Sequence, residues 1–128
     1  MTAMYNFAWM HEQGFGAAQN YDMALTWYRK SAEAGNASAM YQTAYLLVHR
    51  FGAEEGYAEA AAQMVAALRE GQSTAVAQMT TKSTDWPRPF RRALQSALKE
   101  NGYYDGIVDG LGHAWADGRR IGIIRVWV

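Results

Sequence analysis

The chain has 128 residues, half of them apolar or aromatic, and twelve basic and twelve acidic side chains give a formal net charge of zero. This length suits one compact domain, or a short repeat array with a small appended unit. The neutral charge argues against a nucleic-acid partner. Without cysteine there is no disulfide or thiolate chemistry, and without an apolar run of about 18 residues there is no membrane-spanning helix.

The first seventy residues predict four helices in two pairs. The helices are expected from Thr2 to about Gln13, from Asn20 or Asp22 to about Ala34, over 37–50 and over 55–70. Glycines follow their ends, as left-handed C-terminal residues require: Gly14, Gly16, Gly35 and Gly71. The predicted apolar face of the first helix consists of Met4, Phe7, Ala8 and His11. That of the second consists of Ala24, Leu25, Trp27, Tyr28 and Ala32.

The two pairs are related by a step of 36 residues. Ala3, Met4, Tyr5, Ala8, Tyr21, Ala24 and Gly35 fall on Ala39, Met40, Tyr41, Ala44, Tyr57, Ala60 and Gly71. Ala39 falls in turn on Ala75, which opens a third copy. Because glycines and tyrosines stay in step through loops and helices alike, the sequence predicts tandem helical hairpins.

The first hairpin resembles a Sel-one-like repeat, a relative of the tetratricopeptide repeat. The residues that match that pattern are Ala3, Phe7, Ala8, Gly14, Gly16, Ala24, Trp27, Tyr28, Ala32 and Gly35. The second copy departs from it, since Gln63 and Met64 replace the Trp–Tyr pair and a two-residue shift occurs near Arg50–Gly52. The resemblance covers about residues 1–80 and implies an all-α fold, a right-handed α/α superhelix that binds other proteins.

Four aromatic side chains are candidates for binding a protein partner. Tyr5, Trp9, Tyr41 and Tyr45 recur on the first helix of each hairpin, which in such repeats lines the concave surface. Aromatic anchors of this kind carry much of the binding energy at interfaces. The alternative interpretation is that these rings pack in the core between the hairpins.

The C-terminal part differs from the repeats in charge and in pattern. Residues 1–81 have a net charge of −3, whereas residues 82–128 have +3. Residues 81–89 form a predicted linker, with Pro87 and Pro89 interrupting helical structure. An amphipathic helix is expected from about Phe90 to Glu100 within a small helical unit, residues 90–128, whose end, Ile121 to Val128, is apolar and β-prone and is open to a short helix, a strand-like tail or a poorly ordered segment. Since about three repeats are needed for stability, the C-terminal segment is expected to cover the last hairpin.

The string FRRALQSALKENGYYDGIVDG resembles the first half of a peptidoglycan-binding-like domain. Leu94, Gln95, Leu98, Gly102, Tyr103, Gly106, Asp109 and Gly110 match that pattern, but Leu111–Trp115 departs from it, so the unit is incomplete or divergent. The resemblance implies a glycan-binding alternative carried by Tyr103, Tyr104, Asp105 and Asp109. It would place the protein in the cell envelope if a signal segment precedes the chain, and in the cytoplasm otherwise.

No set of residues in the sequence predicts catalysis, a metal or a cofactor. His11, His49 and His113 lack metal-ligand spacing. Asp105 and Asp109 lack the spacing of a calcium loop and are interpreted as turn residues. The sequence therefore predicts a non-enzymatic interaction scaffold with an unidentified protein partner. The alternatives are a peptidoglycan-binding module and an accessory region of a larger enzyme.

Overall fold

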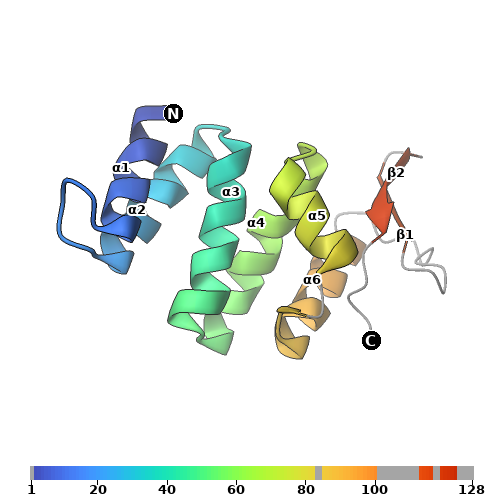
Figure 1. Cartoon of the computed structure of the whole chain (residues 1–128). Coiled ribbons are helices and arrows are strands. Elements are labelled where there is room, and N and C mark those ends of the chain that lie inside the picture. The colour runs from blue at the N-terminus through green and yellow to red at the C-terminus, as the bar shows by residue number, and fades with distance from the viewer. Residues whose placement is uncertain (1, 83–84, 101–112, 117–118, 124–128) are drawn as a thin grey trace.

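The computed structural model describes residues 2–82, 85–100, 113–116 and 119–123. Its helices are α1 (Thr2–Gln13), α2 (Tyr21–Glu33), α3 (Ala37–Tyr45), the π-helix η1 (Leu46–Phe51), the 3-10 turn η2 (Glu54–Gly56), α4 (Tyr57–Arg69), α5 (Ser73–Thr81) and α6 (Arg88–Glu100). The helices lie side by side along one direction, and two short strands follow at the far end (Figure 1). The predicted helical character is confirmed for the described residues up to Glu100.

The predicted helical character of residues 90–128 is wrong for the two segments described after α6, which are strands. Strands β1 (His113–Ala116) and β2 (Arg119–Ile123) pair antiparallel, with His113 opposite Ile123 and Ala116 opposite Arg119. The β-branched residues Ile121 and Ile123 favour an extended, pleated backbone, and Gly122 disfavours a helix. Local preference therefore overrides the helix that the family resemblance implied here.

The helix ends repeat at the 36-residue step. Both α2 and α4 span 13 residues, and each is followed two residues later by a glycine with positive φ, 99° at Gly35 and 71° at Gly71. The residue after each glycine caps the next helix, since the Asn36 side chain accepts from the Ala39 amide at 3.1 Å and the Gln72 side chain accepts from the Ala75 amide at 2.7 Å. Glycine and cap together turn the chain sharply from one helix into the next.

The first helix of the second hairpin runs two residues further than that of the first, to Phe51 where Gln13 corresponds to His49, and its last part is a π-helix. Residues Leu46–Phe51 extend α3 with the wider i→i+5 winding, and Gly52 ends the segment with φ 65°. A π-turn absorbs extra residues without breaking a helix. The following loop is correspondingly short, so α4 begins 36 residues after α2.

Successive helices pack on one another in chain order: α1 on α2, α2 on α3, and α3 on α4. One core runs through all of them. It consists of small residues (Ala8, Ala24, Ala32, Ala39, Ala44, Ala60, Ala67) and larger ones (Leu25, Tyr28, Leu46, Met64, Leu68, Met79). The alanines allow close approach of the helix axes, and the larger side chains fill the remaining space.

The C-terminal helix covers the second hairpin, as the sequence predicted. Helix α6 packs on α4 and buries Phe90, Leu94 and Leu98 completely. Trp86, which lies in the predicted linker, is only 1% exposed. Residues 85–100 therefore belong to the same core as the hairpins. Within the described segments, no helix combines the length and apolar character needed to cross a membrane, as expected.

Candidate protein-interaction surface

The exposed large apolar side chains belong to the two hairpins, and most of them to the first. Among the residues with described side chains they are Phe7 (51% exposed), Trp9 (42%), Phe15 (60%), Met23 (39%) and Phe51 (40%). All lie within the first 51 residues, whereas the apolar residues of α6 are buried. The end of the molecule that carries α1 and α2 thus differs in chemistry from the end that α6 covers.

Trp9 and Phe15 form one exposed pair, called the tip pair below. Their ring centroids lie 5.5 Å apart, one ring on α1 and the other in the loop that follows it. The loop is held by backbone and side-chain bonds, since the Asn20 amide donates to the His11 carbonyl at 2.8 Å and Gln19 Nε2 donates to the Glu12 carbonyl at 3.0 Å. The tip pair is therefore presented on an ordered loop.

The exposed phenylalanine recurs in the second hairpin. Phe15 and Phe51 each directly precede a glycine with positive φ, 74° at Gly16 and 65° at Gly52. A Cβ at position 16 would lie 2.9 Å from the methyl carbon of Met10, a flexible end that can move aside, so the positive φ is what favours glycine there. Neither Phe15 nor Phe51 was among the residues predicted to bind a partner. The signal that identifies them is an aromatic residue beside a glycine at the repeat step.

Of the four predicted partner-binding residues, Trp9 is the most exposed. Tyr5 is half-buried, and its ring lies edge-on to Tyr28 with the centroids 5.3 Å apart. Burial raises the pKa of its hydroxyl, although the hydrogen bond with Gln42 lowers that pKa in part. Tyr41 is 5% exposed, and burial raises the pKa of its hydroxyl to about 12. Tyr41 therefore belongs to the core rather than to an open surface.

Trp86 explains the burial of Tyr41 and the partial burial of Tyr45. Its ring lies 6.3 Å from Tyr41, 6.1 Å from Tyr45 and 4.4 Å from His49, and it tilts against Phe90 at 4.8 Å. Its indole N–H donates to the Gln78 side-chain oxygen at 3.2 Å. The alternative interpretation of core packing therefore describes Tyr41 in the second hairpin better than partner binding does.

Arg50 connects the two hairpins at the surface. Its guanidinium lies 5.8 Å from the ring of Tyr21, at the start of α2, and 5.8 Å from the ring of Tyr45, on α3. Such a cation over two aromatic faces gives a modest attraction at an exposed position. A positive charge is thus held beside the aromatic residues of both hairpins.

A carboxylate is buried in the first hairpin. Glu12 is buried on α1, and the Tyr28 hydroxyl on α2 donates to its Oε1 at 2.6 Å. Burial, together with this carboxylate, raises the pKa of Tyr28 and keeps its hydroxyl protonated as a donor. Val48 and Met64 stand one step of 36 residues further on, both buried. The second hairpin thus replaces a hydrogen-bonded pair with an apolar one.

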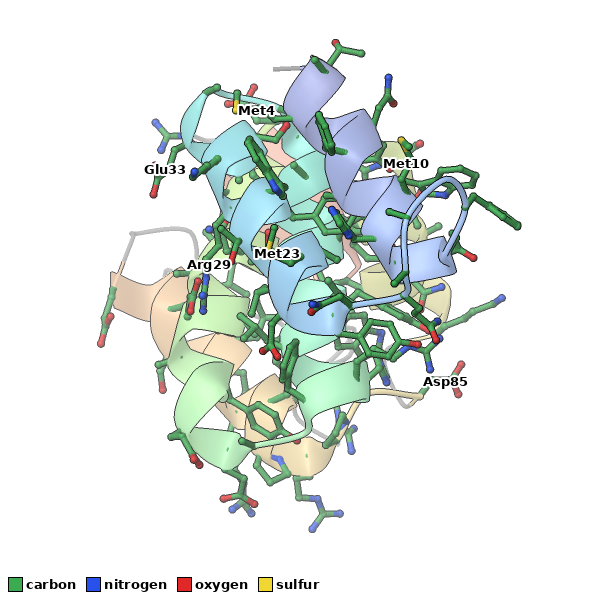
Figure 2. The ribbon with its side chains drawn as sticks, turned by 90° about the vertical axis from the view of Figure 1, so that its left-hand side faces the viewer. Met4, Met10, Met23, Arg29, Glu33 and Asp85 are labelled. Carbon is green, nitrogen blue, oxygen red and sulfur yellow. The ribbon has the colours of Figure 1, made fainter. Side chains whose placement is uncertain are left out.

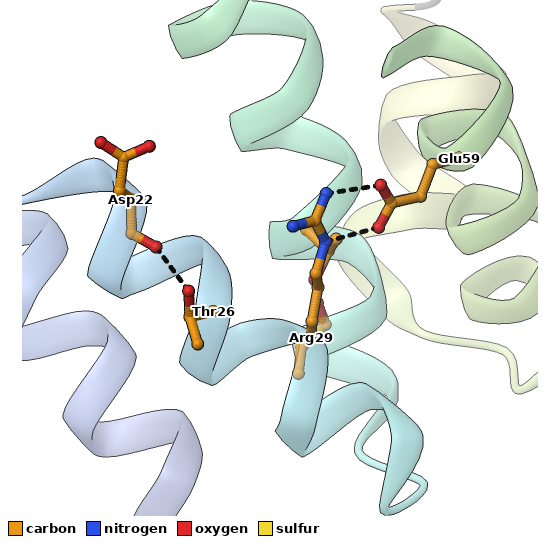
Figure 3. Close-up of polar contacts among 6 residues, drawn as sticks. Asp22, Thr26, Arg29 and Glu59 are labelled. Carbon is orange, nitrogen blue, oxygen red and sulfur yellow. Dashed lines mark hydrogen bonds and ion pairs between the residues drawn. The ribbon is translucent and has the colours of Figure 1, made fainter.

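An ion pair joins α2 to α4. Arg29 Nε and Nη2 each donate to one oxygen of Glu59 at 2.6 Å (Figure 3), and this bond raises the pKa of the guanidinium. On the same helix, Thr26 donates to the Asp22 carbonyl at 2.9 Å. Both side chains of the ion pair are more than a third exposed, so solvent screening limits its contribution to less than about 1 kcal/mol. The pair fixes the relative placement of the hairpins more than it stabilises them.

His49 makes the stability of the Trp86 cluster depend on pH. Burial lowers its pKa below the usual value, and Arg50 lowers it further while Asp85 opposes the shift. Below a pH of about 6.5 the unfolded chain binds a proton at this position while the folded chain does not, so stability falls as pH decreases and levels off below the folded pKa. Urea unfolding at pH 7.5 and pH 5.5 measures this fall. We expect it to be smaller in His49→Gln, and an equal fall in both proteins would contradict the assignment.

The predicted glycan-binding residues cannot be placed in the fold, because the structure does not describe them. Tyr103, Tyr104, Asp105 and Asp109 lie outside the described residues, so glycan binding stays a prediction. In the described part of the chain, no three His, Asp or Glu side chains are grouped to hold a metal ion. Comparison with protein-family models, with curated proteins and with solved structures found no match for the chain.

Proposed function

We propose that this chain is a non-catalytic protein-interaction module built from Sel-one-like helical repeats. The helical pairs would follow one another in a right-handed superhelix, in line with helix ends and glycines that recur 36 residues apart. The observation that carries the proposal is the ordered and exposed tip pair, Trp9 and Phe15. Large apolar side chains held in place at a surface are typical of binding sites.

The partner that suits this surface is a peptide segment with apolar side chains. The tip pair offers two aromatic faces whose burial on binding is favourable and costs little side-chain entropy, because the ordered loop already positions Phe15. Within the second hairpin, Phe51 offers a further apolar contact beside the cationic Arg50. The partner is therefore expected to carry more than one apolar anchor.

Selection from a random peptide-display library with the intact chain tests this proposal. We expect enriched peptides with apolar anchors, and a loss of affinity of about thirtyfold or more in the variant Trp9→Ala with Phe15→Ala, as for interface hot spots. Met23→Ala is the matched control, since it removes an equally exposed apolar side chain from α2. Equal binding by the double variant and the wild type would overturn the proposed surface.

A further inference from the structure

A second apolar surface lies at the outer end of the first hairpin, and we call it the end face. It consists of Phe7 on α1 and Met23 and Trp27 on α2. Figure 2 views the molecule from this end, with Met10 and Met23 labelled on the two nearest helices. The Phe7 ring stacks on Trp27 at 5.4 Å, with Lys30 4.6 Å from the Trp27 ring. Phe7 and Trp9 are separated by roughly 200° around α1, so the end face is distinct from the tip pair.

The sequence predicted that Phe7 belongs to the core. Its predicted apolar face comprised Met4, Phe7, Ala8 and His11, yet in the structure only Ala8 of these four is fully buried. Phe7 is 51% exposed, and among the described rings it stacks only along the helix pair itself, on Trp27 and on His11. Helix α1 thus has the apolar pattern of a buried helix, although the side that carries Phe7 is exposed.

The second hairpin shows what covers such a face. Thr43 and Leu46 stand 36 residues after Phe7 and Met10, and both are completely buried. Helix α3, which carries Thr43, and the π-helix, which carries Leu46, both pack on α2 of the preceding hairpin. The equivalent positions in the chain are therefore closed by the second helix of a hairpin.

The ion pair between the two hairpins also relates the end face to the interface between the hairpins. Glu59 stands 36 residues after Met23, and it is bound by Arg29 from α2 of the first hairpin. Met23 therefore occupies the position at which the second helix of a preceding hairpin would contact the first hairpin. It is 39% exposed and apolar there.

We infer that the end face is a docking site for one further helical hairpin of the same repeat kind, stacked through its second helix onto α1. Terminal repeats of a solenoid usually present a polar outer face for solubility. At this end, Phe7 and Met23 present an apolar one, whereas α6 closes the opposite end of the second hairpin. The added hairpin would continue the interface that already joins the first hairpin to the second. The inference rests on the 36-residue correspondence and is independent of the peptide surface proposed above.

Duplication of the first hairpin tests this inference with the intact chain. Residues 1–36 are placed directly before residue 1. Gly35 and Asn36 of the added copy then precede Thr2 and Ala3 of the original chain. The spacing is the one at which the original Gly35 and Asn36 precede Ser38 and Ala39. The added copy carries Phe7→Thr and Met23→Glu, the residues found at these positions in the second hairpin. These changes make the new outer face polar and distinguish the two copies by mass spectrometry.

We expect the extended protein to unfold in a single transition, with a melting temperature raised by about 5 °C or more. Hydroxyl-radical labelling of the original Phe7 should fall several-fold. Separate melting of the added hairpin with unchanged labelling of Phe7 would overturn the inference. So would a concentration-dependent dimer of the unextended chain that protects Phe7, because the occupant would then be a second copy.

The unextended chain provides a second measurement that does not need the duplication to fold. Phe7→Thr with Met23→Glu removes the apolar end face from side chains that are largely exposed. We expect an unchanged melting temperature and reduced binding of a hydrophobic dye such as ANS. A large loss of melting temperature would show that these side chains serve the core of the first hairpin, which would also overturn the inference.

Discussion

Replacement of Trp86 by alanine is expected to destabilise the folded chain by about 3–5 kcal/mol, the range for removal of a fully buried aromatic side chain. Trp86 is 1% exposed and contacts rings from α3, the π-helix and α6. Its removal leaves a cavity where the predicted linker meets the second hairpin. Urea unfolding followed by circular dichroism measures the loss.

Trp9→Ala is the matched control for this prediction, since it removes the same side chain from a position that is 42% exposed. We expect it to cost less than about 1 kcal/mol, as for surface substitutions. Trp86→Phe separates packing from hydrogen bonding, because it retains an aromatic ring and loses the bond to Gln78. Similar stability of Trp86→Ala and Trp9→Ala would contradict the buried position of Trp86.

Tyr28→Phe is expected to cost about 1–3 kcal/mol, because it leaves a buried carboxylate without its donor. The Tyr28 hydroxyl on α2 donates to Glu12 Oε1 at 2.6 Å, and Glu12 is buried on α1. The substitution removes a single oxygen atom and creates little empty space, so the measured loss reports mainly on the unpaired carboxylate. The free energy of unfolding in urea measures it.

A double-mutant cycle tests whether the two groups act as a pair. The second hairpin carries apolar residues at both positions, Val48 and Met64. Glu12→Val with Tyr28→Phe is therefore expected to cost less than the sum of the two single substitutions, because neither polar group is left unpaired. Additive losses would show that the hydroxyl and the carboxylate do not depend on each other.

The helices could be predicted from the sequence because glycines and caps act locally. Gly35 and Asn36 specify the end of one helix and the start of the next through their own backbone angles and hydrogen bonds, so the bounds of α2 and α3 follow from a few residues. At the C-terminal strands the two kinds of sequence information disagreed, because the family resemblance implied a helix whereas Ile121 and Ile123 prefer a strand, and the local preference was the better guide.

The surfaces were less predictable than the helices, because burial depends on partners distant in the chain. Tyr41 and Tyr45 share a periodic pattern with Tyr5, but only the position of Trp86 decides that the Tyr41 ring is enclosed. Phe7 has the pattern of a core residue and is exposed, since the side on which another hairpin would pack is open. A helical period thus specifies which side of a helix is apolar and not what covers it.

The central claim is that Trp86 and α6 close one end of the helical stack, whereas the other end is apolar and exposed. Hydroxyl-radical footprinting of the intact chain tests this claim most directly, with the labelling of each residue measured by mass spectrometry. We expect Phe7, Trp9 and Phe15 to be labelled rapidly, and Trp86, Phe90 and Tyr28 to be protected. Labelling of Trp86 and Phe90 as rapid as that of Trp9 and Phe15 would contradict the account.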